Sequence, residues 1–322
     1  MALINIATVH WQTDKWVDPQ LHYLARALEE PYRVFASLNG IEAQEVWERF
    51  HFAADLPGSH AVKLNRLAEI IGESAGRDDV LIFLDGDAFP VRPLVRWLGD
   101  VLRRHPLAAV RRDENLGDLQ PHPSFCATTV GFWQDIEGDW RSGATWTNSA
   151  GREVADIGGN LLYQLRDHHI EWKPLLRTNT HNPHPVWFGV YDHRIYHHGG
   201  GFQATMVERV DWAERYRTKS VAGRSLRPTE ESPSLGTLRA RLTADPAALR
   251  RLRPRHLRGV GSATVKTIRL RLEHRHYRRL TETDRGRQLA ELEAEVFRRL
   301  SSDDDFYLAF DDVLPPPSDR SD

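Results

Sequence analysis

The chain has 322 residues and a formal net charge of −2, and 40% of its residues are hydrophobic and 27% charged, as in an ordinary globular enzyme. Its one cysteine, Cys126, excludes an internal disulfide, and no apolar stretch approaches the roughly 20 residues that a membrane helix needs. The N-terminal sequence MALINIATVH has neither the basic flank nor the apolar run of a signal peptide. We therefore expect a cytoplasmic protein without a membrane span.

Strand-like and helix-like patterns alternate through the first 200 residues. Apolar runs without helical spacing predict strands, and apolar residues at i, i+3, i+4 and i+7 predict amphipathic helices. The predicted order is strand 3–9, helix 21–28, strand 32–40, helix 60–73 and strand 79–84. The first helix should present Leu21, Leu24, Ala25 and Leu28 to the core. This order predicts an α/β fold with a mostly parallel sheet covered on both faces.

The later elements are shorter and less regular. We expect strands at 107–111, 125–132, 186–190 and 195–196, and helices at 158–166, near 245–252 and in two stretches of 263–300. The predicted organisation is an α/β domain over 1–218, a basic, mainly helical region over 219–312, and a tail over 313–322 that is disordered by composition.

The clearest chemical signal is the run DVLIFLDGDAFP, in which an apolar strand leads directly into Asp85-Gly86-Asp87. In open α/β sheets, ligands bind outside the carboxyl ends of the strands, where these carboxylates would stand. Such a pair can bind a hard divalent cation, which would neutralise a diphosphate leaving group. The alternative is a polar turn after a core strand, because the same pattern recurs at Asp303 and Asp305 without a preceding strand.

With this motif, residues 1–200 resemble the metal-dependent GT-A-fold glycosyltransferases. The resemblance rests on a first strand that ends in a polar segment, on the helix HAVKLNRLAEII and on DVLIFLDGDAFPVRPL. It implies a GT-A-like, Rossmann-type mixed sheet and hexosyl transfer from a nucleotide-diphosphate sugar, with UDP-sugars favoured, to an acceptor hydroxyl. It also implies Mn²⁺ or Mg²⁺ held directly by Asp87, with Asp85 contacting the ribose or the metal. Further donor contacts are implied for Thr8, His10, Lys63 and Asn65.

A histidine near residue 200 falls where many members of this family place a third metal ligand. The run Ile195-Tyr196-His197-His198-Gly199-Gly200-Gly201 ends a predicted strand, and its glycines would let a loop fold over a diphosphate. Neutral imidazole is a suitable ligand for Mn²⁺-like ions. The resemblance favours His197, because His-x-Gly is the commoner family arrangement, and leaves His198 open. A surface turn in a chain with 16 histidines is the alternative.

Asp156, in VADIGGNLLYQL, matches the acceptor-side carboxylate of the family, which removes the proton of the acceptor hydroxyl in inverting members. An equally good interpretation is an N-cap at the helix that follows. Weaker acceptor-side candidates are the side chains Trp133, Asp113 and Trp146. Most tryptophans at this density belong to the core, and we expect Cys126 to be buried and inert.

Charge is unevenly distributed in the last third of the chain. Residues 221–280, named here the basic segment, hold 15 Lys and Arg against 4 Asp and Glu, a net of +11. Residues 281–322 hold 5 against 12, a net of −7. The basic segment can bind an anionic acceptor such as nucleic acid, or it can be neutralised by the acidic residues that follow. It therefore keeps two alternatives open: a glycosyltransferase acting on a DNA base hydroxyl, and a non-catalytic anion- or nucleic-acid-binding protein.

Overall fold

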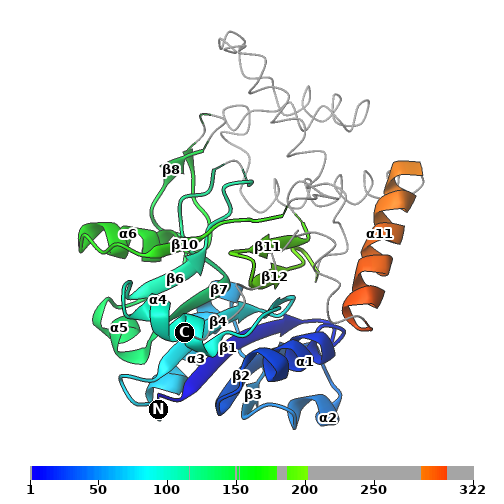
Figure 1. Cartoon of the computed structure of the whole chain (residues 1–322), viewed down its shortest axis with the longest axis horizontal. Coiled ribbons are helices and arrows are strands. Elements are labelled where there is room, and N and C mark those ends of the chain that lie inside the picture. Colours follow the sequence, from blue (N-terminus) through cyan, green and yellow to red (C-terminus); the bar gives the residue numbers. More distant parts are fainter. Residues whose placement is uncertain are drawn as a thin grey trace, which may run out of the picture. The chain divides into compact units, whose positions relative to one another are not determined.

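A seven-stranded mixed sheet is the main structural element of the first 200 residues (Figure 1). In this computed structural model the described residues are 2–115, 117–148, 151, 153–179, 187–201 and 284–302. The strand order is β10-β6-β7-β4-β1-β2-β3. The strands are β1 (Ile4–Trp11), β2 (Tyr32–Asn39), β3 (Phe52–Ala54), β4 (Val80–Asp85), β6 (Leu107–Val110), β7 (His122–Thr129) and β10 (Lys173–Leu175).

Most neighbours in this sheet are parallel. β1 pairs in parallel with both β2 and β4, β2 with β3, and β10 with β6, whereas β7 runs antiparallel to β4 and β6. Val9 of β1 lies opposite Asp85 of β4, so the carboxyl ends of these two central strands meet at one edge. The predicted α/β class with a mostly parallel, mixed sheet is confirmed.

Two smaller antiparallel sheets are formed by segments that do not belong to the main sheet. One has the order β11-β12-β5, formed by β5 (Ala88–Pro90), β11 (Gly189–Tyr191) and β12 (Ile195–His197). The other pairs β8 (Trp146–Thr147) with β9 (Glu153–Val154). In the first of them His197 lies opposite Ala88, so a strand near residue 196 is joined to the chain that leaves β4.

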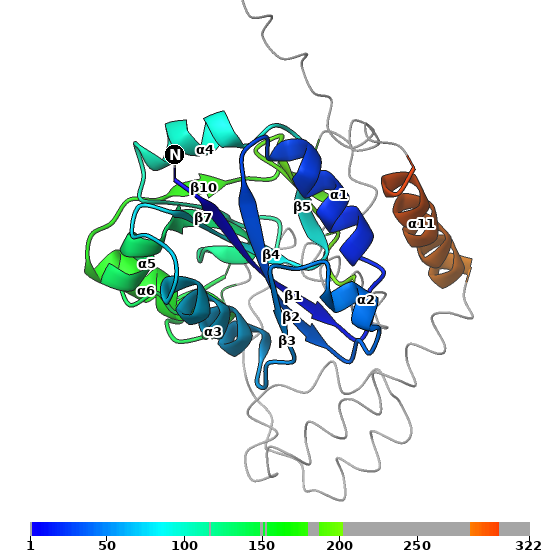
Figure 2. The ribbon, with the colours of Figure 1, turned by 90° about the horizontal axis from the view of Figure 1, so that it is seen from below.

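Helices cover both faces of the main sheet (Figure 2). Side chains of α1 (Val17–Ala27), α2 (Gln44–Trp47) and α4 (Val95–Leu102) share one hydrophobic cluster with the strands. Side chains of α3 (His60–Gly72), α5 (Val130–Asp135) and α6 (Gly159–Asp167) share the other. A further helix, α11 (Asp284–Leu300), closes the described part, and its Leu300 carbonyl accepts a hydrogen bond from the Tyr23 hydroxyl at 3.3 Å.

Two details of the expected elements are wrong. The strand predicted for 125–132 ends at Thr129, because the Thr129 hydroxyl accepts a hydrogen bond from the Phe132 amide and caps helix α5. In α1, Ala25 is exposed, and the buried face runs through Gln20, Tyr23 and Leu24. The pattern correctly placed Leu24 and Leu28 in the core but missed Gln20, because a glutamine does not count as a core residue in an apolar pattern. Cys126 is buried as expected, and burial raises the pKa of its thiol well above the usual range.

The chain divides into two units, residues 1–203 with 298–322 and residues 204–297. The domain limits predicted at 218 and 312, the helix near 245–252, the basic segment, the tail and Asp303 and Asp305 all lie outside the described residues. Within the described ranges, no helix combines the length and the apolar character needed to cross a membrane.

Candidate metal centre

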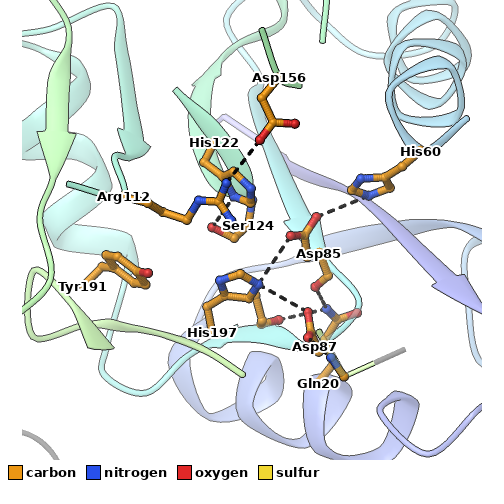
Figure 3. A network of polar contacts seen from close by, with 12 residues as sticks. Gln20, His60, Asp85, Asp87, Arg112, His122, Ser124, Asp156, Tyr191 and His197 are labelled. Carbon is orange, nitrogen blue, oxygen red and sulfur yellow. Dashed lines mark hydrogen bonds and ion pairs between the residues drawn. The ribbon is translucent and has the colours of Figure 1, made fainter. Parts of the chain in front are cut away.

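Asp85, Asp87 and His197 meet at the carboxyl edge of β4. Asp85 is the last residue of that strand, Asp87 follows in the tight connection to β5, and the pairing of β5 with β12 carries His197 to the same place. His197 Nε2 lies 3.5 Å from Asp85 Oδ2 and 3.5 Å from Asp87 Oδ1 (Figure 3). One ligand atom from each residue falls within 4.8 Å of the other two. These three residues form a candidate metal site, named here the triad.

The chemistry of the triad fits a divalent cation. Burial raises the pKa of Asp85. Burial also acts to raise the pKa of Asp87, but the adjacent His197 and the Gly201 amide outweigh it, so that pKa is well below its usual range. Asp85 Oδ1 is buried and faces His60 Nε2 at 3.2 Å, yet no described group donates a hydrogen bond to it. Two crowded carboxylates and an imidazole are a donor set for Mn²⁺ or Mg²⁺.

The glycine run holds Asp87 through the backbone. The Gly201 amide donates to Asp87 Oδ2 at 2.8 Å, and the His198 amide donates to the Asp87 carbonyl at 3.0 Å. A Cβ at residue 201 would lie 2.5 Å from Trp16 Nε1 and 2.9 Å from Asp87 Oδ2, closer than real Cβ atoms come. Gly201 is therefore required for the approach of this loop to the carboxylate.

His198 does not belong to the triad. Its ring packs against Trp16 at 4.4 Å and Phe188 at 5.0 Å between centroids, and its Nδ1 lies 3.0 Å from the Tyr196 hydroxyl. The structure thus brings His197, and not its neighbour, to the two aspartates. Adjacent residues on an extended chain point to opposite sides, and that alternation separates the two histidines.

The residues expected to contact the donor do not lie together in the structure. Thr8 and His10 are completely buried beneath the triad and both meet Gln20 of α1, rather than solvent. Lys63 Nζ lies 4.4 Å from the centroid of the Trp11 ring, and burial lowers the pKa of this lysine. Trp11 is 44% exposed at the carboxyl end of β1, a position that the sequence reasoning missed.

Asn65 has a different partner from the one expected. Its Nδ2 donates to Asp139 at 2.6 Å and its Oδ1 accepts from the Trp140 amide at 3.0 Å. The amide of Asn65 therefore ties α3 to the segment before α6. No contact of Asn65 with the triad is among the interactions of the described residues.

Asp156 lies beside a buried arginine. Arg112 Nη2 is 3.5 Å from Asp156 Oδ2 (Figure 3). The same nitrogen is 3.1 Å from Asp118 Oδ2. Burial acts to lower the pKa of Arg112, but Asp118 and Asp156 outweigh it and raise the pKa. The Asp156 side chain is 50% exposed, and the α6 N-cap is Gly158, so the N-cap interpretation is wrong. Arg112 was missed, although it directly follows the predicted strand at 107–111.

The weaker acceptor-side candidates are scattered. Trp133 is buried in the core, with its ring 4.5 Å from Phe83 and 5.5 Å from Trp140 between centroids. Trp146 is also buried. Asp113 is half-exposed and pairs with Arg111 at 2.7 Å. As the density of tryptophans indicated, these rings serve packing.

No family model matches the sequence, and no curated protein matches it. Among solved structures, the chain is similar to S. aureus TarS 1–349, with 11% identity over 44% of this chain and 50% of that one and a TM-score of 0.33. It is similar to the galactosyltransferase LgtC in complex with donor and acceptor sugar analogs, with 11% identity over 70% of this chain and 98% of that one and a TM-score of 0.37. It is also similar to glucosyl-3-phosphoglycerate synthase from Mycobacterium tuberculosis, with 13% identity, 54% and 70% coverage and a TM-score of 0.33.

The alignment with TarS 1–349 thus spans half of that chain's length. Similarity at this level assigns this chain to no family. Its own geometry defines it as an α/β protein with a mixed, mostly parallel sheet and a candidate metal centre at the carboxyl edge of β4.

Proposed function

We propose that this chain is a metal-dependent glycosyltransferase that moves a sugar from a nucleotide-diphosphate sugar to an acceptor hydroxyl. The observation that carries the proposal is the convergence of Asp85, Asp87 and His197 at the carboxyl edge of a parallel strand pair. The Asp85-Gly86-Asp87 motif, His197 and Asp156, which carry the GT-A resemblance, all lie in the same structural unit. Two buried carboxylates that face each other are costly unless a cation joins them.

In the proposed reaction, Asp85, Asp87 and His197 would hold Mn²⁺ or Mg²⁺, which would supply positive charge to neutralise the departing diphosphate. The chain's own groups hold that centre in place, since Gly201 and His198 fix Asp87 through backbone amides. The Trp11 ring, which is exposed at this edge and packs on the buried Lys63, can contact the nucleotide part of a donor. UDP-sugars are our favoured donors.

Asp156 is the proposed general base. As the new bond forms between the acceptor oxygen and the anomeric carbon, the bond from that carbon to the diphosphate oxygen breaks, and the acceptor proton passes to the Asp156 carboxylate. Its half-exposed position allows contact with a substrate, and Arg112 holds it in place from the buried side. This assignment applies to an inverting reaction.

Thermal stability in the presence of nucleotide sugars tests the proposal. UDP-, GDP- and TDP-sugars would each be added with Mn²⁺ or with EDTA, and a CMP-sugar, which has a single phosphate, would serve as the control. A ligand present at a hundred times its Kd stabilises the folded state by about 2.7 kcal/mol. We expect a rise in Tm for one nucleotide that requires the metal and is absent in Asp87→Asn. No rise with any donor in the wild type would contradict the proposal.

The basic segment motivates the alternatives. Its net charge of +11 favours an anionic acceptor, such as a hydroxylated base in DNA, or a role in binding without catalysis. DNA binding that is salt-dependent and unchanged in Asp87→Asn, together with no response to any nucleotide sugar, would support the non-catalytic alternative.

A further inference from the structure

A buried glutamine joins helix α1 to the turn that carries the two aspartates. Gln20 is completely buried, and its Nε2 donates to the Asp85 carbonyl at 2.9 Å and to the Ala88 carbonyl at 2.9 Å. These two carbonyls bracket the turn Asp85-Gly86-Asp87-Ala88. One side-chain amide therefore spans both ends of the turn between β4 and β5 (Figure 3).

The oxygen of the same amide also has hydrogen-bonding partners, which lie on β1. Gln20 Oε1 lies 3.1 Å from the Thr8 hydroxyl and 3.2 Å from His10 Nε2. Because backbone carbonyls only accept hydrogen bonds, the NH₂ group must face the turn and the oxygen must face β1. Both N–H groups donate and the oxygen has two donors, so every hydrogen-bonding position of the amide is used. His10 is then the tautomer protonated on Nε2.

The two carbonyls that accept hydrogen bonds from Gln20 are connected through the backbone or the strand pairing to all three residues of the triad. Asp85 carries one carboxylate itself, and the Ala88 carbonyl belongs to the residue that lies opposite His197 in the pairing of β5 with β12. Asp87 lies between them. A shift of either end of this turn changes the separation of the carboxylates, or their distance from the imidazole.

We infer that Gln20 is a positioning residue of the metal centre, which sets the spacing of the Asp85 and Asp87 carboxylates by fixing the ends of their turn. Thr8 and His10 orient the amide from β1 and act through it. This inference rests on the proposed function only in that the triad binds a divalent cation. It gives Thr8 and His10 a structural role in place of the donor contacts expected from the sequence.

The affinity for Mn²⁺ measures the positioning directly, without donor or acceptor. The full chain would be titrated with Mn²⁺, and free Mn²⁺ followed by its electron paramagnetic resonance signal. Gln20→Met keeps the length of the side chain and removes both N–H donors. We expect its Kd for Mn²⁺ to rise about 10–100-fold, the usual effect of losing an outer partner of a metal site. Thr8→Val should raise the Kd about two- to tenfold, as loss of one hydrogen bond does.

A control on the same helix separates positioning from stability. Leu24 is buried on α1 in the hydrophobic core and its side chain has no hydrogen-bonding group, so Leu24→Val should lower Tm without removing a side-chain hydrogen bond. Its Kd for Mn²⁺ should equal that of the wild type. In the double variant Gln20→Met/Thr8→Val, the second change should add nothing to the Kd, because the hydroxyl acts only through the amide.

The outcomes are distinct. Folded Gln20→Met that binds Mn²⁺ as tightly as the wild type would overturn the inference and leave the proposed function standing. If Gln20→Met does not fold, Thr8→Val decides in its place, and an unchanged Kd there overturns the inference. Wild type that binds no Mn²⁺ would overturn the metal centre and the inference together.

Discussion

Two buried acidic sites in this molecule treat their carboxylates in opposite ways. Asp139 has a donor for each oxygen: Asn65 and Asn160 donate at 2.6 Å each, and Arg141 donates through its backbone amide at 2.9 Å and through its guanidinium. Burial acts to raise the pKa of Asp139, but these hydrogen bonds outweigh it and the pKa is lowered. The protein itself satisfies this charge.

Asp85 and Asp87 have side chains about as little exposed as that of Asp139, but their carboxylates lie close to each other and receive few hydrogen bonds. Asp87 receives one amide from Gly201, and Asp85 Oδ1 receives no hydrogen bond from the described residues. The remaining attraction comes from the imidazoles of His60, which faces Asp85, and His197, which lies between the two carboxylates. A saturated carboxylate stabilises the fold, whereas a crowded and unsaturated pair is the arrangement expected of a cation site. An Asp→Asn substitution at each site, which replaces one carboxylate oxygen by an amide nitrogen, tests whether the carboxylate serves metal binding or stability.

The largest effect is expected at Asp87. Asp87→Asn keeps the shape and the acceptor for the Gly201 amide but removes a charged ligand. Transfer activity should fall to background, and the affinity for Mn²⁺ should fall by more than the ~10–100-fold that loss of an outer partner costs. Without metal the free energy of unfolding should fall only slightly, because the lost attraction between Asp87 and His197 is partly offset by relief of the repulsion from Asp85. Mn²⁺ titration and chemical unfolding in EDTA measure the two quantities, and a clear loss of stability would place this aspartate in the same class as Asp139.

Asp156 should show a large effect on rate alone. Asp156→Asn removes the proposed base, and loss of a general base lowers kcat by about 10²–10⁴-fold. The affinities for donor and Mn²⁺ should be unchanged, because the residue does not belong to the triad. Steady-state kinetics on the donor and acceptor found by the thermal screen would measure this. A change in KM for the acceptor with kcat preserved would show that Asp156 binds substrate and takes no proton.

The matched change at Asp139 should act on stability only. Asp139→Asn places an NH₂ group among side chains that are themselves donors, so buried hydrogen bonds are lost and the free energy of unfolding should fall by about 2–4 kcal/mol. Mn²⁺ affinity should equal that of the wild type. Urea unfolding and Mn²⁺ titration of the same sample provide the comparison with Asp87→Asn. Weaker Mn²⁺ binding by folded Asp139→Asn would show that the two sites are coupled.

Much of the fold and part of the site could be predicted because they depend on local pattern. The run before Asp85 is apolar without helical spacing, and its place before two aspartates indicated both a central strand and a metal site. His197 could be ranked above His198 only by resemblance, because the separation of the two rings depends on β12 pairing with β5.

The rest depends on contacts between distant segments. Gln20 looks like a surface residue in the sequence, since a single polar side chain on an apolar helix face has no local sign of its partners. Arg112 is likewise buried only because Asp118 and Asp156 neutralise it. Trp133 was an acceptor candidate, yet it is a core residue because strand pairing ends at Thr129 and α5 turns its ring inward.

The smallest effect is expected at His10, and it extends the comparison to a buried basic group. Complete burial lowers the pKa of His10 to about 4, from about 6.5 in an unfolded chain, although Gln20 acts to raise it. Between these values the unfolded state binds more protons, so this contribution to stability is present above pH 6.5 and is lost as pH falls toward 4. The loss at pH 5 should be about 2 kcal/mol.

His10→Gln keeps a donor for the Gln20 oxygen and cannot titrate. Unfolding by urea in EDTA at pH 7 and pH 5 should therefore show a smaller difference for this variant than for the wild type, and His168→Gln, at an exposed histidine, is the control. An equal pH dependence for His10→Gln and the wild type would mean that His10 is charged or accessible in the folded state, and its complete burial as a neutral side chain against Gln20 would then be wrong.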